Sequence, residues 1–177
     1  MSYVAVYGVA SPDTPNKVLT HVEDIASTLA ALGVRFERWQ PATALDKGAS
    51  EAELIAAYQS QIKALGYADV ELSSVTCDHP HKAQLRTQNL VEHCYSEDHV
   101  RLVIAGQGLF TLHLDDYVYA VRCERNDLLV IPAGTPHWFD IGQNPHFMTL
   151  RMFNTRQGTV PSVTGEPIAA VFPGLDD

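Results

Sequence analysis

Apolar positions in the N-terminal half of the chain recur with the period of an α-helix. In the segment 21–33, HVEDIASTLAALG, every third or fourth residue is apolar and a glycine closes the segment. The segment 50–66 has the same spacing, and it begins with Ser50 three residues before Glu53, a pair that caps helix N-termini. A shorter helix is predicted at 82–90. The pattern therefore predicts three helices in this half.

From residue 91 onward the apolar positions alternate with a period of two, which is typical of strands. The runs are short, rich in β-branched and aromatic residues, and separated by turn sequences such as GQG, RND and GTP. The opening YVAVYGVA alternates in the same way and is predicted as an edge strand. Strands this short and evenly spaced indicate a barrel or a jelly roll. The predicted strands of this half are 99–105, 108–114, 117–124, 127–133, 137–141 and 146–153.

Length and pattern together predict a single domain that is mainly β. No repeat or low-complexity linker divides the 177 residues, a length that fits one domain with a sizeable core. We expect an N-terminal strand and helices over 1–90, a β-barrel core over 91–153 and an irregular tail over 154–177. The helices should form a layer on the outside of the barrel.

The amino-acid composition limits the binding partners and the cellular compartment that we expect. The chain is 46% hydrophobic and 19% charged, as in ordinary globular proteins. A net charge of -9 argues against nucleic acid and against anionic membranes as partners. No Lys or Arg precedes Lys17, so a signal peptide is not indicated, and three cysteines without a C-x-x-C pair favour a reducing compartment. We expect a cytoplasmic protein that is a monomer or a small homo-oligomer.

Histidines that could hold a metal ion come from two distant segments. His93 and Tyr95 are two residues apart, so both side chains can point into a barrel, and His99 has the same parity. His137 follows the turn PAGTP, which can direct it to the same point. Each residue alone is more often a packed, hydrogen-bonded side chain, as we interpret His113. Their joint occurrence favours a metal site with N and O ligands.

The spacing of these residues resembles the two cupin motifs. The pattern H-x-Y-x3-H-x6-G resembles the first motif, and the segment 132–137, PAGTPH, matches the core of the second. Tyr95 and His99 stand where the first motif has a histidine and a glutamate. Within the cupins, VRFERWQ and PAGTPHWFD resemble the acireductone dioxygenase family, and the resemblance extends over most of the chain.

The resemblance implies a cupin-type β-barrel, also called a double-stranded β-helix or jelly roll, and a metal-dependent dioxygenase. The implied reaction is the cleavage of the acireductone 1,2-dihydroxy-3-keto-5-methylthiopentene by O2 in methionine salvage. The implied cofactor is one metal ion, iron, with nickel as the alternative, and the partners are a small-molecule substrate and O2. By position in the motifs, the metal ligands are His93, Tyr95, His99 and His137, the catalytic arginine is Arg101, and the substrate-binding residues are Trp138, Phe139 and Arg151.

The two departures from the motif leave several alternatives open. Tyr95 could restore the lost negative charge as a phenolate, which favours Fe(III), or the site could be a neutral set of three imidazoles. Glu97 or Asp98 could supply the missing carboxylate after a local shift of the chain. The protein could also be a diverged dioxygenase acting on another enediol or keto acid, or a cupin that binds a metal or small molecule without catalysis.

Overall fold

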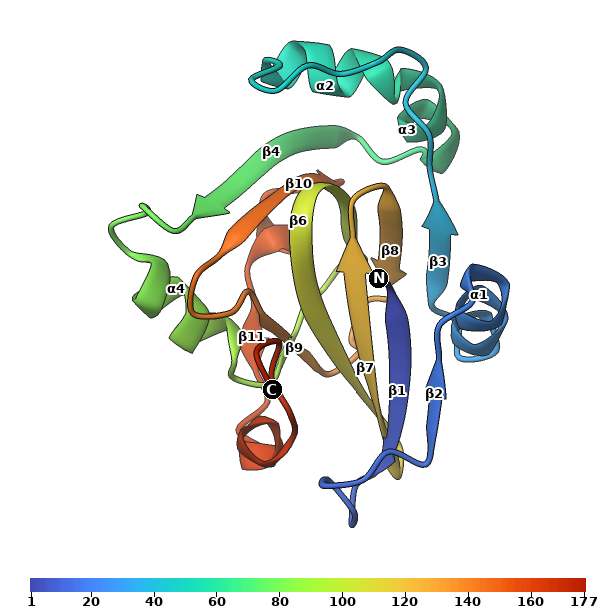
Figure 1. Cartoon of the computed structure of the whole chain (residues 1–177), viewed down its shortest axis with the longest axis vertical. Helices are drawn as coiled ribbons and strands as arrows, with labels where there is room; N and C mark the ends of the chain where they lie inside the picture. The colour runs from blue at the N-terminus through green and yellow to red at the C-terminus, as the bar shows by residue number, and fades with distance from the viewer.

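The computed structural model describes all 177 residues, and antiparallel strands make up most of its regular secondary structure (Figure 1). No helix in it has the length and apolar character that crossing a membrane requires. The strands are β1 (Tyr3–Gly8), β2 (Lys17–Leu19), β3 (Arg35–Arg38), β4 (Asp69–Thr76), β5 (His93–Cys94), β6 (His99–Leu114), β7 (Tyr117–Glu124), β8 (Asp127–Ile131), β9 (His137–Asp140), β10 (His146–Phe153) and β11 (Ser162–Val163).

The long strand β6 belongs to two sheets that face each other. Its first half pairs with β8 and β10, and these continue outward to β3 and β4. Its second half pairs with β7 and β9. On one side β7 pairs with β1, which pairs with β2, and on the other side β9 pairs with β5, which pairs with β11. The two sheets enclose a common interior. This arrangement is a jelly roll, as the pattern of short strands predicted.

The helices lie outside the sheets (Figure 1). They are α1 (Val22–Ala30), α2 (Glu51–Ala57), α3 (Gln59–Leu65) and α4 (Lys82–Asn89), with short 3-10 turns η1 (Gln157–Thr159) and η2 (Pro167–Val171) in the tail. Leu54, Tyr58 and Ile62 from the α2–α3 segment pack on the outward side chains of β6, among them Val100 and Leu102. The predicted helical layer is therefore present.

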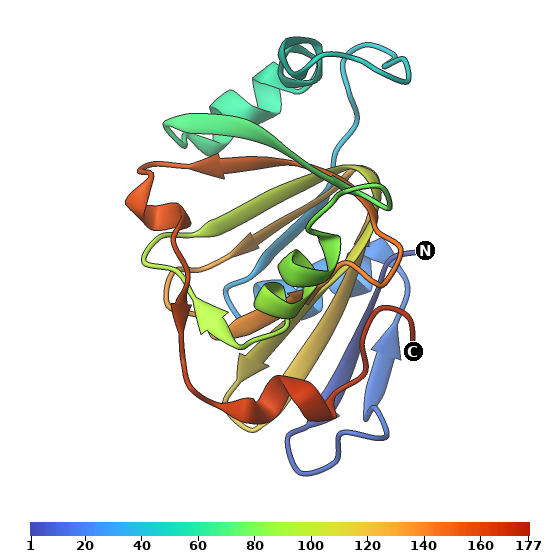
Figure 2. The same cartoon turned by 90° about the vertical axis from the view of Figure 1, so that its left-hand side faces the viewer.

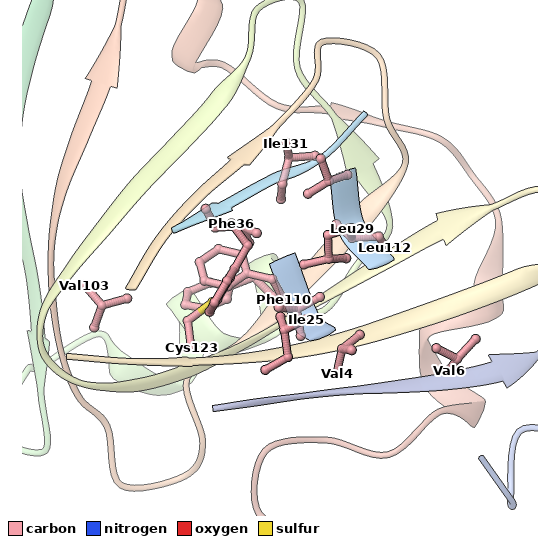
Figure 3. Close-up of a cluster of buried hydrophobic side chains, with 14 of the residues drawn as sticks. Val4, Val6, Ile25, Leu29, Phe36, Val103, Phe110, Leu112, Cys123 and Ile131 are labelled. Carbon is pink, nitrogen blue, oxygen red and sulfur yellow. The ribbon is translucent and has the colours of Figure 1, made fainter. Parts of the chain in front are cut away.

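The interior of the jelly roll is apolar away from the site described below. Figure 3 shows Phe110, Leu112 and Cys123 from the second sheet meeting Ile131 of β8 and Leu29 of α1. On β6, the side chains of even-numbered residues from 100 to 104 face the helices, and those of odd-numbered residues from 99 to 103 face the interior. Alternation along this strand thus brings two polar residues, His99 and Arg101, inside.

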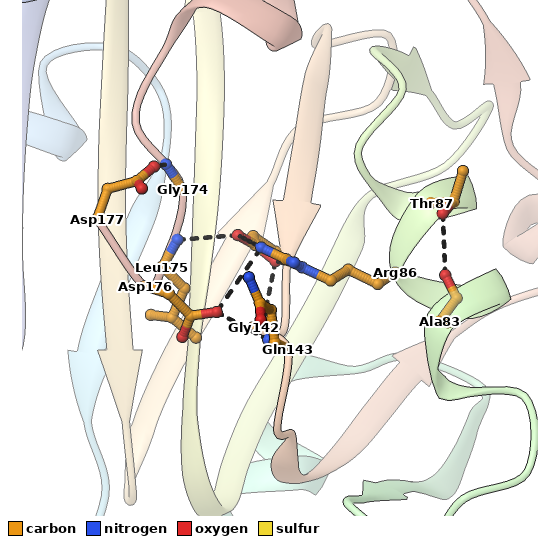
Figure 4. Close-up of polar contacts among 10 residues, drawn as sticks. Ala83, Arg86, Thr87, Gly142, Gln143, Gly174, Leu175, Asp176 and Asp177 are labelled. Carbon is orange, nitrogen blue, oxygen red and sulfur yellow. Dashed lines mark hydrogen bonds and ion pairs between the residues drawn. The ribbon is translucent and has the colours of Figure 1, made fainter.

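The C-terminal tail follows the outside of the sheets and is anchored near its end (Figure 2). The Arg86 Nε of α4 donates to the Asp140 Oδ1 at 2.7 Å, and the backbone N–H of Leu175 donates to the other carboxylate oxygen at 2.8 Å (Figure 4). Asp140 is the last residue of β9, the strand that begins with His137. The anchor therefore ties α4 and the tail to a strand that builds the site.

The structure differs from the sequence-based expectation in three places. The predicted helix 50–66 is interrupted at Tyr58, where the backbone leaves the helical region. The side chain of Tyr58 is buried, and its hydroxyl donates to the Asn126 Oδ1 at 3.0 Å. The strands β3 and β4, within the region expected to be helical, join the sheet, and β11 lies in the tail expected to be irregular. The predicted turn GQG is a bend within the continuous strand β6.

Candidate metal and substrate site

Four side chains predicted as metal ligands meet inside one end of the jelly roll. The ring of Tyr95 lies 5.4 Å from the ring of His93, 4.6 Å from that of His99 and 5.6 Å from that of His137, measured between centroids. All four residues are at most 8% exposed. The strand pairing explains the meeting, because His93 of β5 stands directly opposite His137 of β9.

Backbone carbonyls orient two of the imidazoles. The Nδ1 of His93 lies 2.6 Å from the carbonyl oxygen of Val91, and the Nδ1 of His137 lies 2.8 Å from that of Thr135. A carbonyl only accepts, so each Nδ1 carries the proton and each Nε2 keeps a free lone pair. Metal-binding histidines are commonly fixed in this way by a hydrogen bond from the other ring nitrogen.

His99 is hydrogen-bonded on both sides of its ring. Arg101 Nε donates to His99 Nε2 at 3.0 Å, and His99 Nδ1 lies 2.9 Å from His137 Nε2. A bare His137 Nε2 makes His99 the donor of the second bond. A chain of hydrogen bonds therefore runs from Arg101 through His99 to His137.

Two arginines bring positive charge to this cluster without a carboxylate partner. Arg101 of β6 and Arg151 of β10 stand directly opposite each other, and neither forms a salt bridge. Arg101 Nη1 donates to the Thr149 hydroxyl at 3.0 Å, whereas the buried Nε of Arg151 has no hydrogen-bond partner. The Arg151 guanidinium lies 4.8 Å from the centroid of the Tyr95 ring. Paired like charges are unfavourable across a sheet, so the arrangement suits an anionic ligand.

Burial keeps the three imidazoles neutral. Burial lowers the pKa of His99 well below its ordinary value, and the charge of Arg101 adds to this effect. Burial likewise lowers the pKa of His137 to about 3, and it lowers the pKa of His93. Burial, followed by the charge of Arg151, lowers the pKa of Arg101 to about 10, which leaves its guanidinium charged at neutral pH.

These pKa values predict a protein that loses stability in mild acid. Below a pH of about 6.5, the ordinary histidine pKa, these histidines become protonated in the unfolded chain, whereas their buried imidazoles stay neutral in the folded chain. The free energy of unfolding should therefore fall as the pH drops from about 7 toward the folded pKa of about 3 for His137. Urea unfolding at several pH values measures how steeply the free energy of unfolding depends on pH. His137→Phe should make this dependence weaker, and an equal dependence in the variant and the unsubstituted protein would contradict the expectation.

The structure separates the two aromatic residues predicted to bind substrate. Phe139 points into the interior, where its ring stacks on Phe110 at 4.4 Å, and Phe110 lies 6.1 Å from His99. Trp138 points to the opposite face of β9, is 2% exposed, and packs against Phe172 of the tail at 6.0 Å. Successive residues of a strand face opposite ways, so His137 and Trp138 cannot both reach the cluster.

The alternative carboxylates lie outside the cluster. Asp98 accepts hydrogen bonds from the backbone N–H of Ala133 at 3.0 Å and from the Tyr67 hydroxyl at 2.8 Å. Glu97 accepts from the backbone N–H groups of Asn154 and Thr155 at 3.0 and 3.1 Å. Both carboxylates hold the chain around the site, and neither replaces the glutamate of the cupin motif.

The residues fit a metal ion only in part. His93 and His137 fit, because each aims an unprotonated Nε2 inward. His99 does not fit as it stands, because one nitrogen carries a proton and the other accepts from Arg101. No group of three or more His, Cys, Asp or Glu side chains is arranged to hold a metal ion. The ring of Tyr95 fills the space between the imidazoles.

Sequence patterns gave no signal for several residues that shape the site. The Thr149 hydroxyl orients Arg101, and the carbonyl of Thr135 orients His137. Next to His93, the buried carboxylate of Glu92 accepts from His113 at 2.8 Å, which agrees with the interpretation of His113 as a structural histidine. Carbonyl contacts of this kind depend on backbone direction, which a pattern of residue types does not contain.

Comparisons with known proteins agree over most or all of the chain. The sequence model of the ARD/ARD' family matches residues 6–161. The chain belongs to this family. Acireductone dioxygenases from Pseudomonas syringae pv. syringae (strain B728a) and Pseudomonas fluorescens (strain Pf0-1) are each 58% identical to it over 181 aligned residues, which cover 100% of both chains. The enzyme of Pseudomonas aeruginosa (strain UCBPP-PA14) is 53% identical over the same coverage.

A solved structure has the same fold. It is the acireductone dioxygenase from Bacillus anthracis with cadmium ion in its active center, with a TM-score of 0.78 and 23% identity over 92% of this chain and 98% of that chain. The cupin-type fold and the family predicted from the sequence are thereby confirmed, and so is the enzyme class, a dioxygenase. The predicted site residues stay a prediction.

Proposed function

We propose that the chain is an acireductone dioxygenase, which cleaves 1,2-dihydroxy-3-keto-5-methylthiopentene with O2 in methionine salvage. Full-length identity of 58% to relatives of that name supports this function. The observation that carries it is the pair of guanidinium groups, Arg101 and Arg151, which stand opposite each other beside the imidazoles without a carboxylate partner. An enediol bound as an anion would supply the missing negative charge.

The residues of this chain would bind and orient that anion. Arg101 and Arg151 each offer N–H donors in a fixed plane, which suits two neighbouring oxygens on one ligand. Phe110 and Phe139 form an apolar wall behind His99. A metal ion, iron by resemblance and nickel as the alternative, would supply the chemistry of O2, with His93 and His137 as its imidazole ligands. We place this activity in the cytoplasm.

The direct test is turnover of the acireductone under O2 by the full-length protein supplied with Fe(II) or Ni(II). We expect loss of substrate above the rate in protein-free buffer. Substrate binding without loss would favour the second candidate, a cupin that holds an enediol without cleaving it. The observation in favour of that candidate is the replacement of two motif ligands by Tyr95 and His99.

Removing His137 should weaken metal binding strongly. We expect His137→Ala to lower the affinity for Ni(II) by about 100-fold, because it removes one of two preformed nitrogen ligands. Competition with a chelator of known affinity measures the change. His146→Ala, at an exposed histidine at the start of β10, is the matched control and should bind Ni(II) like the unsubstituted protein. Equal affinity in the two variants would refute His137 as a ligand.

Tyr95 is proposed as the anionic ligand of an oxidised centre. Its ring lies within 5.6 Å of all three imidazole rings, and a phenolate bound to Fe(III) absorbs visible light. The Fe(III)-loaded protein should be coloured, and Tyr95→Phe should be colourless while keeping its circular dichroism spectrum. A visible band of the same intensity in Tyr95→Phe would assign the ring to packing alone.

A further inference from the structure

The proton positions around His99 follow from the identity of its neighbours. A guanidinium has donors only, so His99 Nε2, which receives Arg101 Nε at 3.0 Å, must be bare. A neutral imidazole then carries its single proton on Nδ1. That N–H faces His137 Nε2 at 2.9 Å, and this nitrogen is also bare because His137 donates from Nδ1 to Thr135.

The spacing of the two nitrogens suits a metal, but the proton between them does not. Two nitrogen ligands at right angles, each about 2.1 Å from one ion, are about 3.0 Å apart. His99 Nδ1 and His137 Nε2 are 2.9 Å apart. With a proton on Nδ1, however, His99 offers no lone pair on that side, and its N–H occupies the lone pair of His137.

We propose that Arg101, together with the bare Nε2 of His137, holds His99 in the Nδ1–H form, so that His99 caps His137 through a hydrogen bond instead of binding the metal. Arg101 is then a positioning residue for the metal centre. The inference rests on the proposed function only in taking His137 as a metal ligand. An entering ion must break the hydrogen bond between the two imidazoles, which costs roughly three- to tenfold in affinity.

Histidine protonation in the metal-free, full-length protein tests the first half of this proposal. Long-range proton–nitrogen NMR correlations distinguish the two neutral forms of an imidazole. We expect a protonated Nδ1 and a bare Nε2 for His99. In Arg101→Met we expect a measurable fraction of the opposite form, because only the hydrogen bond to His137 Nε2 then favours the proton on Nδ1. No change in Arg101→Met would assign the proton position to His137 alone and overturn the role of Arg101. Arg156→Met, which removes an exposed arginine paired with Glu71, is the control and should leave His99 unchanged. A bare Nδ1 on His99 in the unsubstituted protein would overturn the proposal.

Affinity for Ni(II), the probe metal, tests the second half. His99→Phe keeps a ring of similar size without either nitrogen, and it should bind Ni(II) roughly three- to tenfold tighter than the unsubstituted protein. Arg101→Met should bind Ni(II) at least as tightly as the unsubstituted protein, because the form of His99 with a bare Nδ1 becomes accessible when Arg101 no longer donates to Nε2. Unchanged or weaker binding by His99→Phe would show that His99 does not compete with the metal. Turnover enters neither measurement, so absence of acireductone cleavage would overturn the proposed function alone.

Discussion

Replacing Tyr95 with histidine and His99 with glutamate together is expected to raise the affinity for Ni(II) or Fe(II) by at least about 100-fold. The first substitution adds an imidazole and removes the ring that lies among the three histidines. The second adds a carboxylate and removes the N–H that caps His137. A glutamate at position 99 would also give the unpaired charge of Arg101 a partner. Turnover of the acireductone should rise with metal occupancy.

Chelator competition and metal content after dialysis measure this change. The matched control carries Tyr95→Phe and His99→Gln, which alters the same two positions without adding an anionic or imidazole ligand. Because it also removes the imidazole N–H that caps His137, it should gain at most the roughly three- to tenfold in affinity that loss of this hydrogen bond gives. Equal affinity in the histidine–glutamate variant and this control would contradict the expectation. It would mean that the residues at positions 95 and 99 do not limit metal binding.

Gly106→Ala is expected to destabilise the fold by at least about 3 kcal/mol. A Cβ at Gly106 would lie 1.5 Å from the carbonyl oxygen of His146, which belongs to the backbone of β10 and cannot turn aside. The residue also has a φ of 74°, in the left-handed region that favours glycine. The bend at Gly106 carries β6 from one sheet to the other, so neighbouring pairs on both sides would shift.

Urea or guanidinium unfolding measures the loss. Gly33→Ala is the control, because Gly33 has a similar φ of 78° with no atom within 4 Å of the added Cβ. Gly33→Ala should lower the free energy of unfolding by only about 1 kcal/mol, which is the cost of a left-handed backbone conformation for alanine. Equal losses in the two variants would mean that the contact with His146 is relieved by movement of the strand.

Strand parity predicted much of the site from the sequence. His93 and Tyr95 face inward together as expected, and His137 meets them because the turn before it returns the chain to β5. The same parity argues against Trp138, which the family resemblance placed at the pocket and which packs on Phe172 outside.

Other features depend on contacts between distant residues and had no signal in the sequence. The break at Tyr58 follows from its hydrogen bond to Asn126, 68 positions away. The strand β3 has only four residues, two of them arginine, and it forms because β8 offers a free edge. The direction of the hydrogen bond between His99 and His137 depends on Arg101 Nε and on the Thr135 carbonyl, and no spacing rule contains the placement of either group.

The strand β6 makes the two sheets a single cooperative unit. Its 16 residues pair with β8 and β10 in one sheet and with β7 and β9 in the other, so neither sheet can melt while the other keeps its hydrogen bonds. His99 and Arg101 lie on one half of this strand, and Leu112 of the other half pairs with His137. Heat or denaturant should therefore remove the site and the fold in one transition, and a folded molecule with a locally melted site should not accumulate.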